Sequence, residues 1–441
     1  MRGRGLLIAA LLFVALAGVI YWSNKQKAKE ESAPPKDTTP TVISVSQADI
    51  TKIELKKKDG RDVVLEKSGS DWRITAPQTW AADQDTVNGL LSSLSTLTGD
   101  NVIEQKATDL AQYGLAPPAE TVVIGLKNGK SKTLLVGDEA PTGGEVYAMA
   151  VGDPKVYTMA SYNRNAVDKS VNDLRDKRLL TFNQDSLARV ELSSKGQDIE
   201  FGKNNQGDWQ ILKPGPYRAD GLQVDELVRK LKDAKMDLTG SEDDRKKAAA
   251  AFASATPVGT AKVTDASGTQ ELQVRKDKAG AYYAKSSVVE GVWKSTSELG
   301  DGLNKTVDDF RNKKLFDFGF DDPNKIEMHD GAKSYFFTRG GDKWFSSGKE
   351  LDTVSIQSFI DKLRELTAAK FVDSGFATPA LDVTVTSKDG KRTDKASFSK
   401  QGADYVARRE NETSLYQVDG KTIQDLEAAA AAVKPTAAAK K

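Results

Sequence analysis

Apolar and polar residues alternate along this chain in a pattern that occurs three times. Each copy begins with an apolar-Glu-apolar triplet, which is the alternation of a half-buried strand. A short strand that begins with tryptophan follows each triplet, at Trp72, Trp209 and Trp344. Because a repeated pattern is typical of a repeated structural unit, the sequence predicts three related units. The triplets are Ile53-Glu54-Leu55, Val190-Glu191-Leu192 and Ile326-Glu327-Met328.

An amphipathic helix is predicted directly after each tryptophan strand. Asp83, Asp220 and Asp352 are candidate N-caps, because a short side-chain acceptor can bind the free N–H groups of a first helical turn. Apolar residues then recur at i, i+3, i+4 and i+7, which places them on one helix face. That face is expected to cover one side of a sheet. The three stripes are Val87, Leu90, Leu91, Leu94 and Leu97; Val224, Leu227, Val228, Leu231 and Ala234; and Ile356, Phe359, Ile360, Leu363 and Leu366.

The rest of each copy predicts a strand meander that is closed by a second helix. Turn sequences such as Asn128-Gly129 and Asp389-Gly390 supply the positive φ angles of tight hairpins. In the first two copies the second helix is expected to end with a basic segment, because cations stabilise helix C-termini. We therefore predict an α+β fold of three tandem repeats, each a mostly antiparallel sheet covered by an amphipathic helix. The basic segments are residues 173–180 and 309–316, and the repeat units are residues 42–181, 182–318 and 319–433.

The N-terminal residues predict one transmembrane helix. Arg2 and Arg4 precede an uncharged apolar run, which is near the short end of what crosses the roughly 30 Å hydrocarbon layer as a helix. We predict an uncleaved signal anchor over residues 1–22 that contacts membrane lipid through residues 6–22. Cleavage after Ala17 is the alternative, since a small-x-small sequence ends there. The body of the chain is expected outside the cytoplasm, as for most first segments of this kind.

Both ends of the globular region are predicted to be flexible. Residues 23–41 are rich in Lys, Glu, Pro and Thr and have no apolar periodicity, so they cannot bury enough surface to fold and read as a tether. Lys434-Pro435 ends the last predicted helix, because proline cannot continue one. Residues 434–441 are therefore predicted to be a disordered tail.

Composition and motifs argue against most kinds of chemistry. The formal net charge is +1, so no overall field attracts nucleic acid. The sequence has no cysteine and a single histidine, His329, which is expected to be a solvated residue of a hairpin turn. The sequence contains no phosphate-binding glycine motif, so a nucleotide is not expected as a ligand. We predict a non-enzymatic protein with no catalytic, metal-binding or cofactor-binding residues and no cofactor.

Four motifs together resemble a known family. They are Tyr-Gly-Leu-x-Pro-Pro (Tyr113 to Pro118), Leu-x-Val-Gly-Asp (Leu134 to Asp138), Val156-Tyr157, and the basic segment from Asp173 to Leu180. In combination they are similar to the bacterial domain of unknown function family DUF4340, whose members have an N-terminal membrane segment and no assigned activity. Its members are often encoded beside ABC-2-type permeases and gliding-motility-type auxiliary proteins. The resemblance implies a single-pass protein of the bacterial inner membrane that is an accessory part of an ABC-type transport or envelope assembly. It supplies no site residues.

Two functions remain open from the sequence. The first is a non-catalytic scaffold whose repeats contact ABC-transporter or other envelope proteins. The second is an extracytoplasmic module that binds a polysaccharide or peptide in a groove between repeats. Exposure of the aromatic side chains distinguishes them, because a binding groove must present aromatic rings to its ligand. The informative residues are the three tryptophans with Tyr147, Tyr283 and Tyr405.

Overall fold

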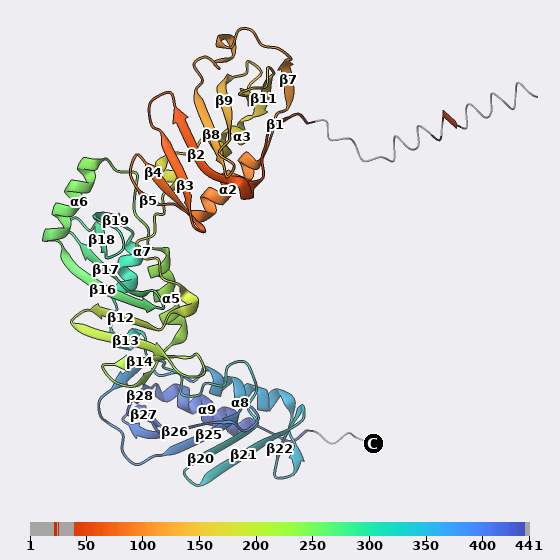
Figure 1. Cartoon of the computed structure of the whole chain (residues 1–441). Coiled ribbons are helices and arrows are strands. Elements are labelled where there is room, and N and C mark those ends of the chain that lie inside the picture. Colours follow the sequence, from red (N-terminus) through yellow and green to blue (C-terminus); the bar gives the residue numbers. More distant parts are fainter. Residues whose placement is uncertain (1–21, 24, 26–38, 437–441) are drawn as a thin grey trace, which may run out of the picture. The chain divides into compact units, whose positions relative to one another are not determined.

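The computed structural model describes residues 22–23, 25 and 39–436, and these fold into two compact units. One unit ends at Asp176 and the other begins at Lys177 (Figure 1). Residues 1–21 of the predicted anchor and most of the predicted tether and tail lie outside the described residues. Among the residues that are described, no helix is both long and apolar enough to cross a membrane.

The first unit contains an antiparallel sheet of nine strands in the order β5-β4-β3-β2-β8-β9-β10-β11-β7, which we call the first sheet. At its centre β2 pairs with β8, so that Ile53 lies opposite Ile124. Ile53 and Leu55 are fully buried and Glu54 between them is not, as the triplet predicts. The strands of this unit are β1 (Thr41–Ser44), β2 (Ile50–Lys57), β3 (Val63–Ser68), β4 (Asp71–Ala76), β5 (Trp80–Ala81), β6 (Thr96–Thr98), β7 (Asn101–Glu104), β8 (Glu120–Leu126), β9 (Ser131–Glu139), β10 (Glu145–Ala150) and β11 (Val156–Ala160), and β1 pairs with β6 separately.

Helix α2 (Gln84–Ser95) covers one face of this sheet. Its N-cap is Asp83, whose carboxylate accepts a hydrogen bond from the Thr86 N–H at 2.9 Å, as predicted. Its buried residues belong to the same core as Ile53 and Ile124, and we call the sheet face that they cover the inner face. The other helical segments of this unit are η1 (Gln47–Asp49), η2 (Ala111–Tyr113), α3 (Ser161–Val167) and α4 (Val171–Leu174).

The second unit contains two further sheets. The third sheet repeats the strand order of the first, and the second sheet repeats it without the last strand. The second sheet is β15-β14-β13-β12-β16-β17-β18-β19, and the third is β23-β22-β21-β20-β25-β26-β27-β28-β24. Their strands are β12 (Arg189–Ser194), β13 (Gln197–Lys203), β14 (Trp209–Lys213), β15 (Tyr217–Arg218), β16 (Thr256–Asp265), β17 (Gly268–Lys276), β18 (Tyr282–Ser286), β19 (Val292–Ser295), β20 (Lys325–Asp330), β21 (Lys333–Gly340), β22 (Lys343–Ser346), β23 (Lys349–Glu350), β24 (Lys370–Val372), β25 (Leu381–Ser387), β26 (Arg392–Gln401), β27 (Asp404–Arg409) and β28 (Leu415–Val418).

Each sheet of the second unit is covered by its own amphipathic helix, α5 (Gly221–Asp233) or α8 (Thr353–Glu365). Asp220 and Asp352 are their N-caps, and both predicted stripes are buried. Mainly antiparallel sheets with amphipathic helices therefore recur along the chain. The remaining helical segments are α6 (Glu242–Ser254), α7 (Ser297–Leu303), α9 (Gly420–Ala432), η3 (Gln184–Ser186) and η4 (Val307–Asp309).

Strand register defines which positions are equivalent in the three sheets. Val190 lies opposite Val263, and Ile326 opposite Val385, as Ile53 lies opposite Ile124. Counting from these pairs aligns every strand of the meanders. Because side chains alternate between the two faces, equivalent positions point to the same face in each sheet.

The prediction that the basic segments end helices is wrong. Helix α4 stops at Leu174 and η4 at Asp309, and extended connectors follow. In the first unit Arg175 forms a β-bridge with Ala82, and in the second unit Arg311 forms one with Ala219. Strand-like pairing satisfies the connector backbone, and apolar pairs then enter the core of the next sheet. Those pairs are Leu179-Leu180 in the second sheet and Leu315-Phe316 in the third.

Candidate functional site

Two of the family-like motifs contact each other in the first unit. Gly114 has a φ of +64°, and a Cβ atom there would lie 2.3 Å from the carboxylate carbon of Asp138. A Cβ atom on Gly137 would lie 2.1 Å from the Tyr113 carbonyl oxygen. Only glycine permits this approach of the Tyr113 loop to β9. The two motifs therefore hold a loop against the sheet, which is a structural role.

The second unit uses different residues at the position of Gly137. In the third sheet this position is Ser399, whose hydroxyl accepts a hydrogen bond from the Ala377 N–H at 3.1 Å. In the second sheet it is Arg275, whose guanidinium lies 4.7 Å from the Phe252 ring of α6. In each sheet, the residue at the position of Gly137 contacts the segment that covers the outer face of the meander, which is the face opposite the inner one.

The three tryptophans are core residues. The exposed fractions of Trp72, Trp209 and Trp344 are 3%, 6% and 5%. The Trp209 indole N–H donates a hydrogen bond to Asp225 at 2.8 Å, and the Lys203 ammonium lies 4.9 Å from its ring. Their rings are therefore not presented as stacking surfaces.

The tyrosines do not form one row. Tyr147 and Tyr283 occupy equivalent positions on the outer face, whereas Tyr405 is one residue out of register. A shift of one residue turns a strand side chain to the other face, and Tyr405 accordingly lies in the core of the third sheet. Tyr283 packs beneath α6. Tyr147 is half-buried and meets the Tyr113 ring at 4.9 Å.

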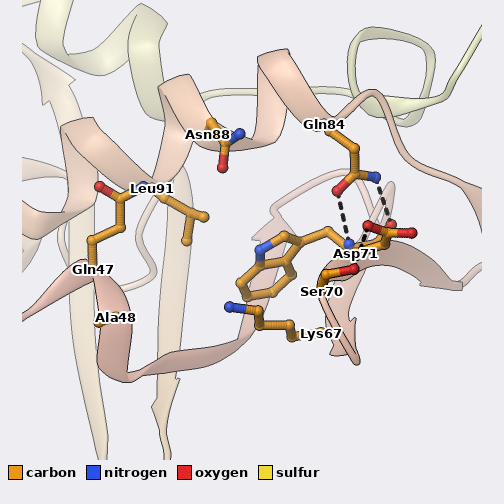
Figure 2. Close-up of a pocket in the computed structure, with 9 residues that line it drawn as sticks. Gln47, Ala48, Lys67, Ser70, Asp71, Gln84, Asn88 and Leu91 are labelled. Carbon is orange, nitrogen blue, oxygen red and sulfur yellow. Dashed lines mark hydrogen bonds between the residues drawn. The ribbon is translucent and has the colours of Figure 1, made fainter.

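A polar depression of about 530 Å³ lies beside Trp72 in the first unit (Figure 2). Gln84 accepts a hydrogen bond from the Trp72 backbone N–H at 2.9 Å and donates one to its carbonyl oxygen at 3.0 Å. Gln84 thereby links the start of α2 to β4, as the dashed lines in Figure 2 show. The remaining lining residues are Gln47, Ala48, Lys67, Ser70, Asp71, Asn88 and Leu91.

Glu120 is a buried carboxyl group in the first unit. It is 5% exposed, and neither carboxylate oxygen has a hydrogen-bond partner among the described residues. Burial, and then the negative charge of Asp168, raise its pKa to about 7, against the opposing effect of Lys57 and Arg164. Lys57, opposite Glu120 on β2, is instead ion-paired with Asp168.

The positions equivalent to Glu120 are not acidic. They are Gly259, opposite Ser194 in the second sheet, and Leu381, opposite Asp330 in the third. Leu381 is 1% exposed, and a Cβ on Gly259 would lie 3.0 Å from the Leu303 Cβ of α7. The other two sheets thus fill this contact with apolar groups. No motif or spacing in the sequence distinguishes Glu120 from the other acidic residues.

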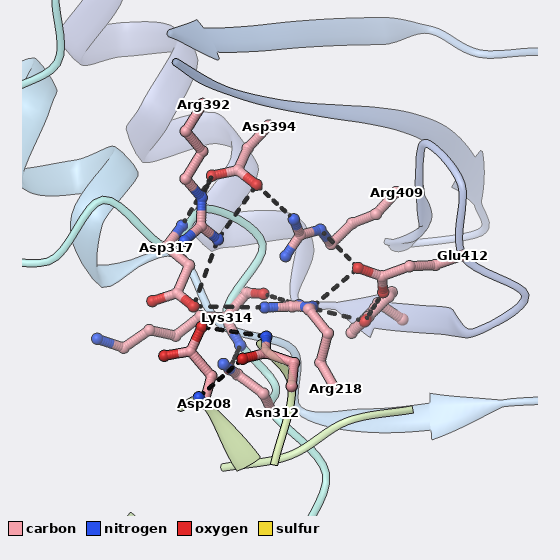
Figure 3. Close-up of polar contacts among 11 residues, drawn as sticks. Asp208, Arg218, Asn312, Lys314, Asp317, Arg392, Asp394, Arg409 and Glu412 are labelled. Carbon is pink, nitrogen blue, oxygen red and sulfur yellow. Dashed lines mark hydrogen bonds and ion pairs between the residues drawn. The ribbon is translucent and has the colours of Figure 1, made fainter. Parts of the chain in front are cut away.

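A cluster of three arginines and three carboxylates lies in the second unit (Figure 3). Arg409 and Asp394 form its buried centre, with an N–O distance of 2.6 Å and exposed fractions of 6% and 5%. Arg392 pairs with the other Asp394 oxygen at 3.0 Å and with Asp317 at 3.5 Å. These residues come from the third sheet and the segment that precedes it.

Arg218 connects this cluster to the second sheet. It extends from β15, and its Nε lies 2.8 Å from the Glu412 carboxylate. It also donates a hydrogen bond to the Lys314 carbonyl oxygen at 2.5 Å. The equivalent position in the first unit is Ala81, which cannot pair with a carboxylate.

Arg311 makes a second link between these two sheets. Its guanidinium lies between the rings of Tyr217 and Phe371, at 4.2 and 3.5 Å from their centroids, and binds Ser414 at 2.7 Å. Contacts of this kind stabilise an arginine that has lost water. The charged groups at this junction therefore join two sheets within one unit.

His329 is exposed, as predicted, but it is not in a turn. It lies in β20, and its Nδ1 is 2.9 Å from the Ser334 hydroxyl oxygen. The turn begins two residues later, at Gly331, with a φ of +55°. Within residues 22–23, 25 and 39–436, no group of three or more His, Asp or Glu side chains is placed to hold a metal ion.

Fold and sites together define a protein of repeated, mainly antiparallel sheets. The chain belongs to the family described as Domain of unknown function (DUF4340), whose model matches residues 72–214 and 209–382. The two matches confirm the resemblance and the internal repeat. Each match begins at a tryptophan strand, within one sheet, and extends into the next sheet. The boundaries of the matched regions therefore do not coincide with those of the sheets. Comparison with curated proteins and with solved structures finds no match.

We expect the Glu120→Leu variant to stabilise the first unit at pH 8. The folded carboxyl keeps its proton up to about pH 7 and the unfolded one up to pH 4.5, so native stability falls as the pH rises between these values. From this pKa shift, we expect Glu120→Leu to raise the free energy of unfolding by on the order of 3 kcal/mol at pH 8 and by much less near pH 4.5. Pulse proteolysis in urea, with fragments of the first unit quantified by mass spectrometry, measures this.

Glu139→Leu is the matched control, because Glu139 is an exposed carboxylate in the same sheet. It should have a small effect at both pH values. If Glu120→Leu changed the stability of the first unit equally at pH 4.5 and pH 8, the raised pKa of Glu120 would be contradicted.

The Asp394→Ala variant should destabilise the second unit by about 3–5 kcal/mol, because it leaves the buried Arg409 without its closest anion. The control is Glu410→Ala, which removes an exposed ion pair with Lys395 and should cost at most about 1 kcal/mol. The same pulse proteolysis reports both values through fragments of the second unit. Similar losses in the two variants would show that the cluster is not a stabilising junction.

Proposed function

We propose that this protein is a membrane-anchored, extracytoplasmic, non-catalytic scaffold and an accessory component of an ABC-type transport or envelope assembly. The observation that supports it best is the burial of the repeated aromatic residues. Trp72, Trp209 and Trp344 are each at most 6% exposed, so they stabilise cores instead of presenting rings to a ligand. This favours a scaffold over the alternative of a polysaccharide-binding groove.

The use of charged residues supports the same proposal. A catalytic site needs ionisable groups held beside a space for substrate. In the second unit the cluster of Arg218, Arg392 and Arg409 with three carboxylates is paired internally and links two sheets. Buried ion pairs of this kind can specify how elements associate, which suits a scaffold.

The proposed location combines the predicted anchor over residues 1–22 with membership of the family. Both are consistent with a body that stands outside the bacterial inner membrane on a tether. Envelope or transporter proteins are then the partners within reach, and the proposal includes no nucleotide and no nucleic acid.

Affinity purification of the full chain with a C-terminal tag, from native membranes, tests the proposal. We expect ABC permease subunits and their auxiliary proteins to co-purify, whereas the same tag on an unrelated single-pass protein should not recover them. Recovery of the protein alone, or with cell-wall glycans, would contradict the scaffold function.

A further inference from the structure

The depression beside Trp72 is lined by polar residues that have counterparts in the second sheet. Strand register aligns the two tryptophan hairpins, and distance from the N-cap aligns α2 with α5. The short helices η1 and η3 align through the apolar-Glu-apolar triplets that follow them. The contacts of four lining residues can therefore be compared between the two sheets. The pairs of counterparts are Trp72 and Trp209, Lys67 and Lys203, Asn88 and Asp225, and Gln47 and Gln184.

In the second sheet all four of these side chains have partners. The Trp209 indole N–H donates a hydrogen bond to the Asp225 carboxylate at 2.8 Å, and the Lys203 ammonium lies 4.9 Å from the centroid of the Trp209 ring. The Gln184 amide oxygen accepts a hydrogen bond from Lys232 at 3.3 Å. The second sheet thus contains a carboxylate bound to a tryptophan N–H beside a cation.

In the first unit the same groups are unbonded within the described part of the chain. Trp72 is 3% exposed, and its indole N–H makes no hydrogen bond to any described residue. The Lys67 ammonium and the carboxamides of Asn88 and Gln47 make none to described residues either. Because the N–H of a buried tryptophan usually has a partner, Trp72 lacks an acceptor that the second sheet supplies from its own helix.

The third sheet differs from both. The residue at the position of Asn88 is Gln357, whose amide donates hydrogen bonds to Asp322 at 3.4 Å and to Asp361 at 3.1 Å. Among the three described tryptophan sites, only that of Trp72 combines an unbonded indole N–H with unbonded carboxamides beside it.

The unbonded groups in the first unit surround one space of about 530 Å³ (Figure 2). Asn88 belongs to α2, Lys67 to β3 and Gln47 to η1. The indole and both carboxamides offer N–H donors, and the lysine adds a positive charge. Charged acceptors form stronger hydrogen bonds than neutral ones, so these groups favour a carboxylate as the ligand.

An acidic residue in the lining is compatible with such a ligand. Asp71 lines the depression, and its carboxylate accepts a hydrogen bond from the Ser70 hydroxyl at 2.9 Å. Its counterpart Asp208 directly precedes Trp209, where the Asp225 carboxylate is nonetheless bound.

We propose that the depression beside Trp72 binds an acidic side chain of a partner protein. The carboxylate accepts the Trp72 indole N–H and lies beside Lys67, as the Asp225 carboxylate does beside Trp209 and Lys203. A neutral carboxamide at residue 88 leaves the acceptor position open. This inference rests on the proposed scaffold function and identifies one of its contact surfaces.

Nuclear magnetic resonance of the full chain with ¹⁵N-labelled tryptophan tests this contact. The sequence contains six tryptophans, so the Trp72→Phe variant can assign the indole resonance of Trp72. A blocked tripeptide with a central aspartate should shift this resonance downfield in a saturable manner, because a carboxylate acceptor deshields the proton. The same tripeptide with asparagine should bind at least tenfold more weakly.

The Asn88→Asp variant supplies the missing carboxylate from α2. Its Trp72 resonance should lie downfield without any peptide, and its affinity for the aspartate peptide should fall at least tenfold. Ser92→Asp is the matched control, because it adds the same charge at an exposed position one turn further along α2. It should weaken binding less than threefold, and the other indole resonances should stay in place in both variants.

The inference is overturned by the absence of a saturable shift, by equal binding of the two peptides, or by unchanged affinity in Asn88→Asp. Tighter binding of glucuronic acid than of the aspartate peptide would assign the site to an acidic glycan and would also overturn it. Failure of this titration would leave co-purification of transporter subunits intact. Carboxylate binding without co-purification would retain the site and reject the transporter assembly.

Discussion

The antiparallel pairing of two strands distant in sequence organises each sheet. β2 pairs with β8, β12 with β16 and β20 with β25, and in each sheet the first amphipathic helix lies between the two partners in sequence. Closing these long loops costs conformational entropy that local hairpins do not incur. Burial of the apolar helix stripe against the joined strands offsets this cost. The tryptophan hairpin then lies on one side of the central pair and the meander on the other.

The twofold alternation of strand side chains explains the other distinctive features. Glu120 lies in the core because its position is inward, as Leu381 shows in the third sheet. Tyr405 faces the core while Tyr147 and Tyr283 face outward, because it is shifted by one residue. Outer faces are covered by whatever segment precedes the meander. That segment is a glycine-dependent loop in the first sheet and α6 in the second.

Local signals allowed the sequence to predict the caps, the helix stripes, the triplets and the α+β class, because each depends on neighbouring residues. The connectors were predicted to be helix ends because their basic residues suit a helix C-terminus. Their backbone instead pairs with residues far away in the sequence, as Arg311 does with Ala219. Glu120 and the Arg218 cluster depend on register and on contacts between sheets, which no spacing reveals.

Hydrogen exchange of the full chain, resolved by mass spectrometry, most directly tests the repeated sheet order. It also tests the one difference in that order, which is that the second sheet ends at β19. The central strands β2, β8, β12, β16, β20 and β25 should exchange slowest, since they are paired on both sides and buried. The edge strand β19 should exchange faster than its equivalents β11 and β28, which have partners on both sides. Equal protection of β19, β11 and β28, or fast exchange in the central strands, would contradict the account.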